Sequence, residues 1–127
     1  MAARTTSTPA PAGSRSRTWA WTAGTGVALL VLLTIHMVAH HFVVEEIGGL
    51  RTYQDVLNYI GNPVIFVIES AFLVVVTIHA MLGLRSVLFD FGLSGHAKRL
   101  VDRALTVLGV ATVAYGFVLI GVLASRA

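Results

Sequence analysis

The chain has 127 residues, of which 56% are hydrophobic and only 12% are charged, and it contains no cysteine. This balance is far from what a water-exposed surface needs, so lipid is the expected solvent. The lack of cysteine excludes disulfides, thiolate zinc sites and iron–sulfur ligation, which leaves five histidines and the carboxylates for metal chemistry. The formal charge of +3 comes from basic residues beside apolar runs, which favours membrane-orientation signals over a nucleic-acid partner.

The segment 1–18 is rich in Arg, Ser, Thr, Pro and Ala and has no acidic residue. This composition predicts a disordered tail. Transit peptides have a similar composition, and so does a basic cytoplasmic tail ahead of a first membrane helix. A cleaved signal peptide does not fit, because the apolar run that follows is too long and too rich in histidine. We therefore expect a cytoplasmic tail at 1–18 ahead of a transmembrane anchor domain at 19–127.

Three apolar runs each reach the roughly 20 residues that a helix needs to cross a bilayer. They predict an all-α membrane protein with transmembrane helices at about 21–44, 63–86 and 103–124. A compact polar turn is expected between the second and third helices, at 90–100.

A short interfacial helix is expected between the first two transmembrane helices. Thr52 and Asp55 have the spacing of a capping box, and an apolar face is formed by Tyr53, Leu57 and Ile60.

Positive charges predict the orientation, because loops that carry Lys and Arg stay in the cytoplasm. One set of helix ends carries Arg4, Arg15, Arg17, Arg85, Lys98, Arg99 and Arg103, whereas the opposite set carries Arg51 and Arg126 alone. We expect the N-terminus and the second loop on the cytoplasmic side of a prokaryotic inner membrane and the C-terminus outside.

Ionisable residues inside a membrane helix cost a few kcal/mol each, so each one is a site hypothesis. Stepping by three and four along the second helix from Glu69 reaches Phe72, Val76, His79, Gly83, Ser86 and Asp90. This stripe is expected to face protein or a cofactor, and Gly83 leaves room for a flat macrocycle beside His79. Hydrogen bonding between helices stays open as the role of His79 on spacing alone.

The first helix carries three histidines, with His36 and His40 one turn apart and His41 about 100° away. They could bind a metal ion directly, but a compact zinc site needs a further ligand and the nearby chain offers none. His36 lies about 22 Å, and His79 about 10 Å, from the cytoplasmic side, so the two cannot clamp one iron atom. If both bind haem, two haems are needed, each with a second ligand from another subunit.

The stretch TIHAMLGLRSVLFDFG resembles the second helix and following loop of the small membrane anchors of succinate dehydrogenase, and the three-helix layout fits as well. The chain lacks the Ser-x-x-His-Arg-x-Thr-Gly type motif of the first small anchor, so it resembles the second, D-type anchor. The resemblance implies half of a two-subunit bundle that binds two b-type haems and a quinone. It implies three partners: a second anchor, an iron–sulfur subunit and a flavoprotein that oxidises succinate. The chain itself would be non-catalytic, serving electron transfer from the tricarboxylic acid cycle to the respiratory chain.

By this resemblance, His79 would ligate the proximal haem and His36 the distal haem, with His40 as the runner-up. Arg85 would pair with a haem propionate. Asp90 and Phe91 would lie near the quinone site, although Phe91 stands where single-haem members have a tyrosine and cannot donate a hydrogen bond to a quinone.

Several alternatives remain open at this stage. The chain could be the anchor of a quinol:fumarate reductase, a related complex that catalyses the reverse reaction. A complex with a single haem is another arrangement. A small proton- or metal-coupled transporter would use Glu69 and the histidines as an ion path, although the chain shows no internal repeat. A purely structural subunit would bind no haem.

Overall fold

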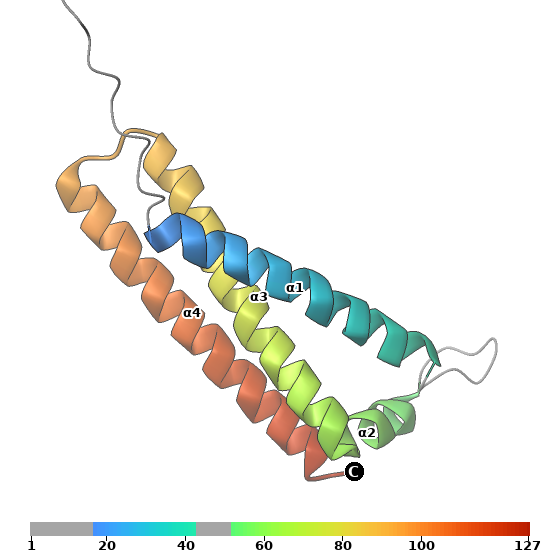
Figure 1. Ribbon diagram of the computed structural model, residues 1–127. Coiled ribbons are helices and arrows are strands. Elements are labelled where there is room, and N and C mark those ends of the chain that lie inside the picture. The colour runs from blue at the N-terminus through green and yellow to red at the C-terminus, as the bar shows by residue number, and fades with distance from the viewer. Residues whose placement is uncertain (1–16, 43–51) are drawn as a thin grey trace, which may run out of the picture.

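The computed structural model describes residues 17–42 and 52–127 of the chain. Its helices are α1 (Arg17–Phe42), α2 (Tyr53–Gly61), α3 (Pro63–Asp90) and α4 (Gly95–Ala124), and the described residues contain no strand. Figure 1 shows the three long helices running beside one another, with the short α2 at one end. Each of the three is long and apolar enough to cross a membrane, which confirms the predicted all-α membrane fold.

The long helices extend beyond the predicted apolar spans. α1 begins at Arg17 instead of about 21, α3 ends at Asp90 instead of 86, and α4 begins at Gly95 instead of 103. The apolar runs mark only the part that crosses hydrocarbon, whereas helical hydrogen bonding continues into the polar interface. The predicted tail at 1–18 lies outside the described residues except for its last two, which are helical, and so does the predicted end of α1 at 43–44.

The predicted capping box of the interfacial helix is present. The Thr52 hydroxyl accepts from the Asp55 backbone N–H at 3.3 Å, and the Thr52 backbone N–H donates to the Asp55 carboxylate at 2.8 Å. Of the predicted apolar face, Leu57 and Ile60 are buried, whereas Tyr53 is exposed. The helix therefore packs on a slightly rotated face that includes the buried Tyr59.

Local signals fix both ends of α3. The Asn62 side chain accepts from the Val64 backbone N–H at 2.9 Å, and Pro63 occupies the first helical position, where no N–H is needed. Beyond the last turn, Gly92 has a φ of 71°, which a residue with a side chain rarely adopts. The connection to α4 is thus shorter than predicted, and Ser94 caps α4 at once.

α3 lies between α1 and α4, and within the described residues the two outer helices make no close backbone approach to each other. α4 packs tightly on α3 at Gly116, where an added Cβ would overlap the Leu73 side chain of α3. This glycine therefore sets how near the two helices lie.

Replacing Gly116 by leucine should destabilise the subunit by about 1–3 kcal/mol, since the new side chain would occupy the space of Leu73. Gly121→Leu is the matched control, because a Cβ at Gly121 of the same helix meets nothing within 4 Å. Both changes raise helix propensity equally, so the difference between them reports packing. Thermal unfolding of the purified complex measures the difference in stability between the two variants. Equal unfolding midpoints would contradict the packing role of Gly116.

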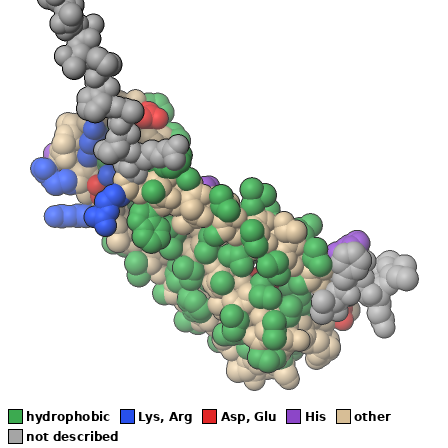
Figure 2. All heavy atoms as spheres, in the orientation of Figure 1, with side chains coloured by type: hydrophobic (Ala, Val, Ile, Leu, Met, Phe, Trp, Pro, Cys, Tyr) green, Lys and Arg blue, Asp and Glu red, His purple; other side chains and the backbone are tan. Residues whose placement is uncertain are grey.

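The core of the described chain is small and sits at the end where α2 packs. It is formed by Ala39, Tyr59, Ile60 and Ile65, with Phe66, Ile120, Leu123 and Ala124 around them. Elsewhere, large apolar side chains face outward along all three long helices. Figure 2 shows these side chains over the middle of the molecule, while Lys and Arg gather at the end where α1 begins and α3 passes to α4. The outer surface is therefore suited to lipid or to another membrane subunit.

Candidate functional site

His79 of α3 lies against α1, on the polar stripe that was expected to face protein or a cofactor. Its Nδ1 is 3.1 Å from the hydroxyl oxygen of the buried Thr25, and its Cε1 is 3.2 Å from where a Cβ on Gly26 would stand. The absent side chain at Gly26 is what lets the imidazole approach the α1 backbone. The side chain is only partly buried, so part of the ring faces outward from this chain.

The neighbours of Thr25 favour one tautomer of His79. The Thr25 hydroxyl has one proton, and the carbonyl oxygens of Trp21 and Thr22 lie 2.8 Å and 3.1 Å from it. With that proton donated to the backbone, the Thr25 oxygen accepts from Nδ1–H of His79. The lone pair is then on Nε2, which has no hydrogen-bond partner in the described part of the chain. This is the form in which neutral imidazole binds a metal.

Open space adjoins His79 one helical turn further along α3. A Cβ on Gly83 would meet nothing within 4 Å, and the same holds for Gly24 on α1. The described chain thus leaves a flat group free to approach this part of α3.

His36 of α1 forms a second polar centre, with partners from two other helices. Its Nδ1 lies 2.8 Å and 2.9 Å from the two carboxylate oxygens of Glu69, and the hydroxyl of Tyr59 donates to Glu69 Oε1 at 2.6 Å. The ring stacks on Phe72, with centroids 5.0 Å apart, and lies 4.3 Å from the ring of His40. Three helices therefore meet at one carboxylate.

The structure corrects the expectation that the first-helix histidines lack a further metal ligand nearby. Glu69 comes from α3, and one ligand atom each from His36, His40 and Glu69 lie within 4.8 Å of one another. The third histidine, His41, has an exposed side chain on another face. The sequence did not reveal Glu69 as a ligand, because it lies far from these histidines along the chain and comes close only through the packing of α3 on α1.

The two histidine centres lie at different depths. His79 contacts Thr25, whereas His36 contacts Glu69, so the contacts are eleven residues apart along α1 and ten along α3. At 1.5 Å per residue this is about 15 Å. A single iron atom cannot reach both imidazoles, as the sequence predicted.

Arg85 faces α4 in this structure. Its Nε donates to Asp102 Oδ1 at 2.6 Å, and its guanidinium lies 4.1 Å from the centroid of the Phe89 ring. Both charged side chains are about one third or more exposed, so the pair contributes at most about 1 kcal/mol. The predicted propionate contact stays a prediction, since this pairing uses only one of the five guanidinium N–H groups.

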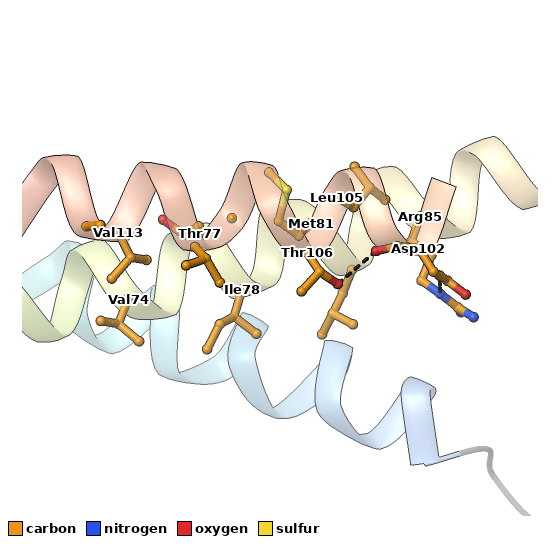
Figure 3. A pocket seen from close by; sticks show the side chains of 13 residues that line it. Val74, Thr77, Ile78, Met81, Arg85, Asp102, Leu105, Thr106 and Val113 are labelled. Carbon is orange, nitrogen blue, oxygen red and sulfur yellow. Dashed lines mark hydrogen bonds and ion pairs between the residues drawn. The ribbon is translucent and has the colours of Figure 1, made fainter. Parts of the chain in front are cut away.

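Arg85 and Asp102 close one end of a groove of about 680 Å³ between α3 and α4 (Figure 3). The rest of the lining is mostly apolar and includes Val74, Ile78, Met81, Leu105, Val110 and Val113. None of the histidines lines this groove. This groove therefore offers no imidazole ligand.

The residues predicted near a quinone lie where α3 ends. Asp90 is exposed at the last position of the helix, and Phe91 exposes 75% of its surface. A large aromatic side chain this exposed is available to a partner or a ligand. His96 is exposed in the first turn of α4, away from both histidine centres.

Sequence reasoning missed Thr25 and Tyr59, the residues that hold His79 and Glu69. A threonine between two glycines inside an apolar span was the available signal for Thr25. Tyr59 gave none, because its partner depends on how α2 folds back onto α3.

The fold and the two centres define a multi-pass membrane subunit that carries partly buried, hydrogen-bonded histidines within its spans. The chain belongs to the family of succinate dehydrogenase/fumarate reductase transmembrane subunits, whose pattern matches residues 5–120. It is 30% identical over 91 residues to the succinate dehydrogenase hydrophobic membrane anchor subunit of Thermoplasma acidophilum, which covers 72% of each chain. No solved structure matches it. These comparisons confirm the family resemblance identified from the sequence.

Proposed function

We propose that this chain is the D-type anchor of a succinate:quinone oxidoreductase, holding b-type haem together with a second anchor subunit and helping to form the quinone site. The observation that carries the proposal is the contact of 3.1 Å between Nδ1 of His79 and the Thr25 hydroxyl. Because this contact engages Nδ1, the other ring nitrogen, Nε2, is the one that would bind a metal. A purely interhelical histidine would need no such free nitrogen.

The residues around His79 fit a haem. The ring is oriented by one hydrogen bond, as metal-binding histidines usually are, and the open space at Gly83 would admit a macrocycle edge. Bis-histidine haem, with the second imidazole from the partner anchor, supplies one-electron transfer when bound. His79 would serve the haem nearer the cytoplasm, and Arg85 would use its remaining N–H groups for a propionate.

His36 is the proposed ligand of a second, distal haem. Its Nδ1 is held by Glu69, which leaves Nε2 for iron. His40, the runner-up, packs its ring 4.5 Å from that of Tyr59. The separation of about 15 Å between the centres supports two haems in place of one.

The quinone is proposed to bind near Asp90 and Phe91, at the charged end of the molecule. Phe91 offers an apolar surface but no hydrogen-bond donor, so the donor to a quinone carbonyl must come from another residue or subunit. The iron–sulfur subunit and the flavoprotein would dock at the same end, because electrons must reach the quinone from them.

The orientation proposal rests on charge. Arg17 begins α1, Arg85 stands near the end of α3, and Lys98, Arg99 and Arg103 lie near the start of α4, whereas Arg126 follows the end of α4. This favours a cytoplasmic N-terminus and an external C-terminus in a prokaryotic inner membrane.

Two alternatives have specific support. The family includes fumarate reductase subunits, which would run the same electron path in reverse. The cluster of His36, His40 and Glu69 could instead hold a metal ion in a small proton- or metal-coupled transporter.

Haem content of the purified complex tests the proposal. A reduced-minus-oxidised spectrum and pyridine haemochrome quantitation should give about two b-type haems per flavin, as two separated ligands require. A value of one would remove the His36 site only. A complex without haem absorbance would refute the anchor's haem role altogether.

A further inference from the structure

A hydrogen-bonded series of three side chains leads to His36. Tyr59 of α2 donates to Glu69 of α3 at 2.6 Å, and Glu69 lies 2.8 Å from Nδ1 of His36 on α1. Tyr59 exposes 6% of its surface, and the side chains of Glu69 and His36 expose 11% and 24%. The carboxylate is therefore shielded from water and held by two donors.

The chemistry of the donors sets the tautomer. A phenol O–H bonded to Glu69 Oε1 uses that oxygen as an acceptor, and Nδ1 lies within 2.9 Å of both oxygens. In its ionised form a carboxylate can only accept, so Nδ1 of His36 would then be the donor and Nε2 would carry the lone pair. The hydrogen bond is charge-assisted, and such bonds are roughly twice as strong as neutral ones.

The choice of a carboxylate needs an explanation beyond orientation. A charged group in a membrane helix costs about 2.5–3.5 kcal/mol on insertion scales, and a glutamine could accept the same hydrogen bonds without that cost. His79 is oriented by a neutral hydroxyl, so the chain does not need charge for orientation. The charge is therefore expected to act on the imidazole itself.

We propose that Glu69 is a positioning residue that raises the electron-donating strength of His36 toward haem iron, and that Tyr59 moderates it by sharing the carboxylate. The inference rests on the proposed function, because it assumes that His36 ligates a haem. A carboxylate hydrogen-bonded to a ligand imidazole raises ligand basicity. It thereby stabilises the oxidised, more positive iron and lowers the reduction potential.

Potentiometric titration of the haem spectra in the purified complex tests the proposal. Glu69→Gln keeps an acceptor but removes the charge, so the haem that depends on His36 should become easier to reduce. A tenfold change in its oxidised-to-reduced ratio at a given potential corresponds to about 59 mV for one electron. Glu69→Asp keeps the charge and should restore most of the potential, while Tyr59→Phe should shift it in the opposite direction.

Thr112→Val is the matched control, since the Thr112 hydroxyl donates to the Leu108 carbonyl of its own helix α4 and its loss should leave the potential of the His36-dependent haem in place. An unchanged potential in Glu69→Gln, or equal shifts in both haems, would overturn the proposal. If the complex does not assemble with Glu69→Gln, Tyr59→Phe replaces it as the test. An unchanged potential of the His36-dependent haem in Tyr59→Phe would then overturn the proposal.

Two further outcomes separate the inference from the function beneath it. Full haem retention in His36→Ala would overturn the second haem and this inference together, whereas haem loss in His36→Ala with no shift in Glu69→Gln would overturn the inference alone. Elemental analysis covers the remaining case. One zinc per complex, lost in His36→Ala, His40→Ala and Glu69→Gln alike, would assign the cluster to a metal ion and overturn the inference.

Discussion

His79→Ala should remove about one b-type haem from the purified complex, because one imidazole is half of a bis-histidine ligand pair and nothing else described near Thr25 can replace it. The reduced-minus-oxidised spectrum and the haem-to-flavin ratio measure this loss. His96→Ala is the control, since His96 is an exposed histidine in the first turn of α4. Unchanged haem content in His79→Ala would contradict the assignment.

The same haem should be lost when the His79 ring is displaced by a neighbouring substitution, Gly26→Val, and not itself replaced. A Cβ on Gly26 would stand 3.2 Å from Cε1 of His79, so the larger Gly26→Val side chain must displace the ring. Gly24→Val makes the same chemical change one half-turn earlier on α1, where a Cβ meets nothing within 4 Å. Loss in Gly26→Val with retention in Gly24→Val would tie haem binding to the position of the His79 ring. Equal retention in both would argue that the ring position is unimportant.

His36→Ala should remove the other haem and leave the His79-dependent spectrum in place, because the two centres lie about 15 Å apart. His40→Ala should retain both haems, since its ring packs against Tyr59 and His36 and is not the proposed ligand. Difference spectra of the two variants, recorded beside His79→Ala, measure these effects. Loss of haem in His40→Ala but not in His36→Ala would make His40 the ligand, and identical spectra for His36→Ala and His79→Ala would indicate one shared haem.

The sequence predicted the parts of the fold that depend on local pattern. Apolar length predicted three spans, and the Thr52 and Asp55 spacing predicted the cap of α2. The stripe through Glu69 and His79 was predicted to face protein or a cofactor, and both side chains contact α1. Each of these follows from residues near one another in the chain. Helix ends were less well predicted, because a helix that leaves hydrocarbon continues through polar residues such as Lys98 and Asp102.

The sequence predicted the histidines of the site but not their partners, because the partners lie far from them along the chain. Histidines in apolar spans are conspicuous, but their partners are ordinary residues that the packing of other helices brings close. Tyr59 and Glu69 are ten residues apart and meet only because α2 folds back on α3. Arg85 pairs with Asp102, which the packing of α4 brings close. Pairings of this kind depend on tertiary contacts that a single sequence does not display.

The central position of α3 has a consequence for biogenesis. Since α1 and α4 approach α3 but not each other in the described chain, the subunit is an open layer whose polar centres are only partly covered. A porphyrin could therefore arrive sideways from the lipid phase before a companion subunit closes over it. Cofactor insertion would then precede the pairing of the two anchor subunits. This chain alone would not enclose the cofactor.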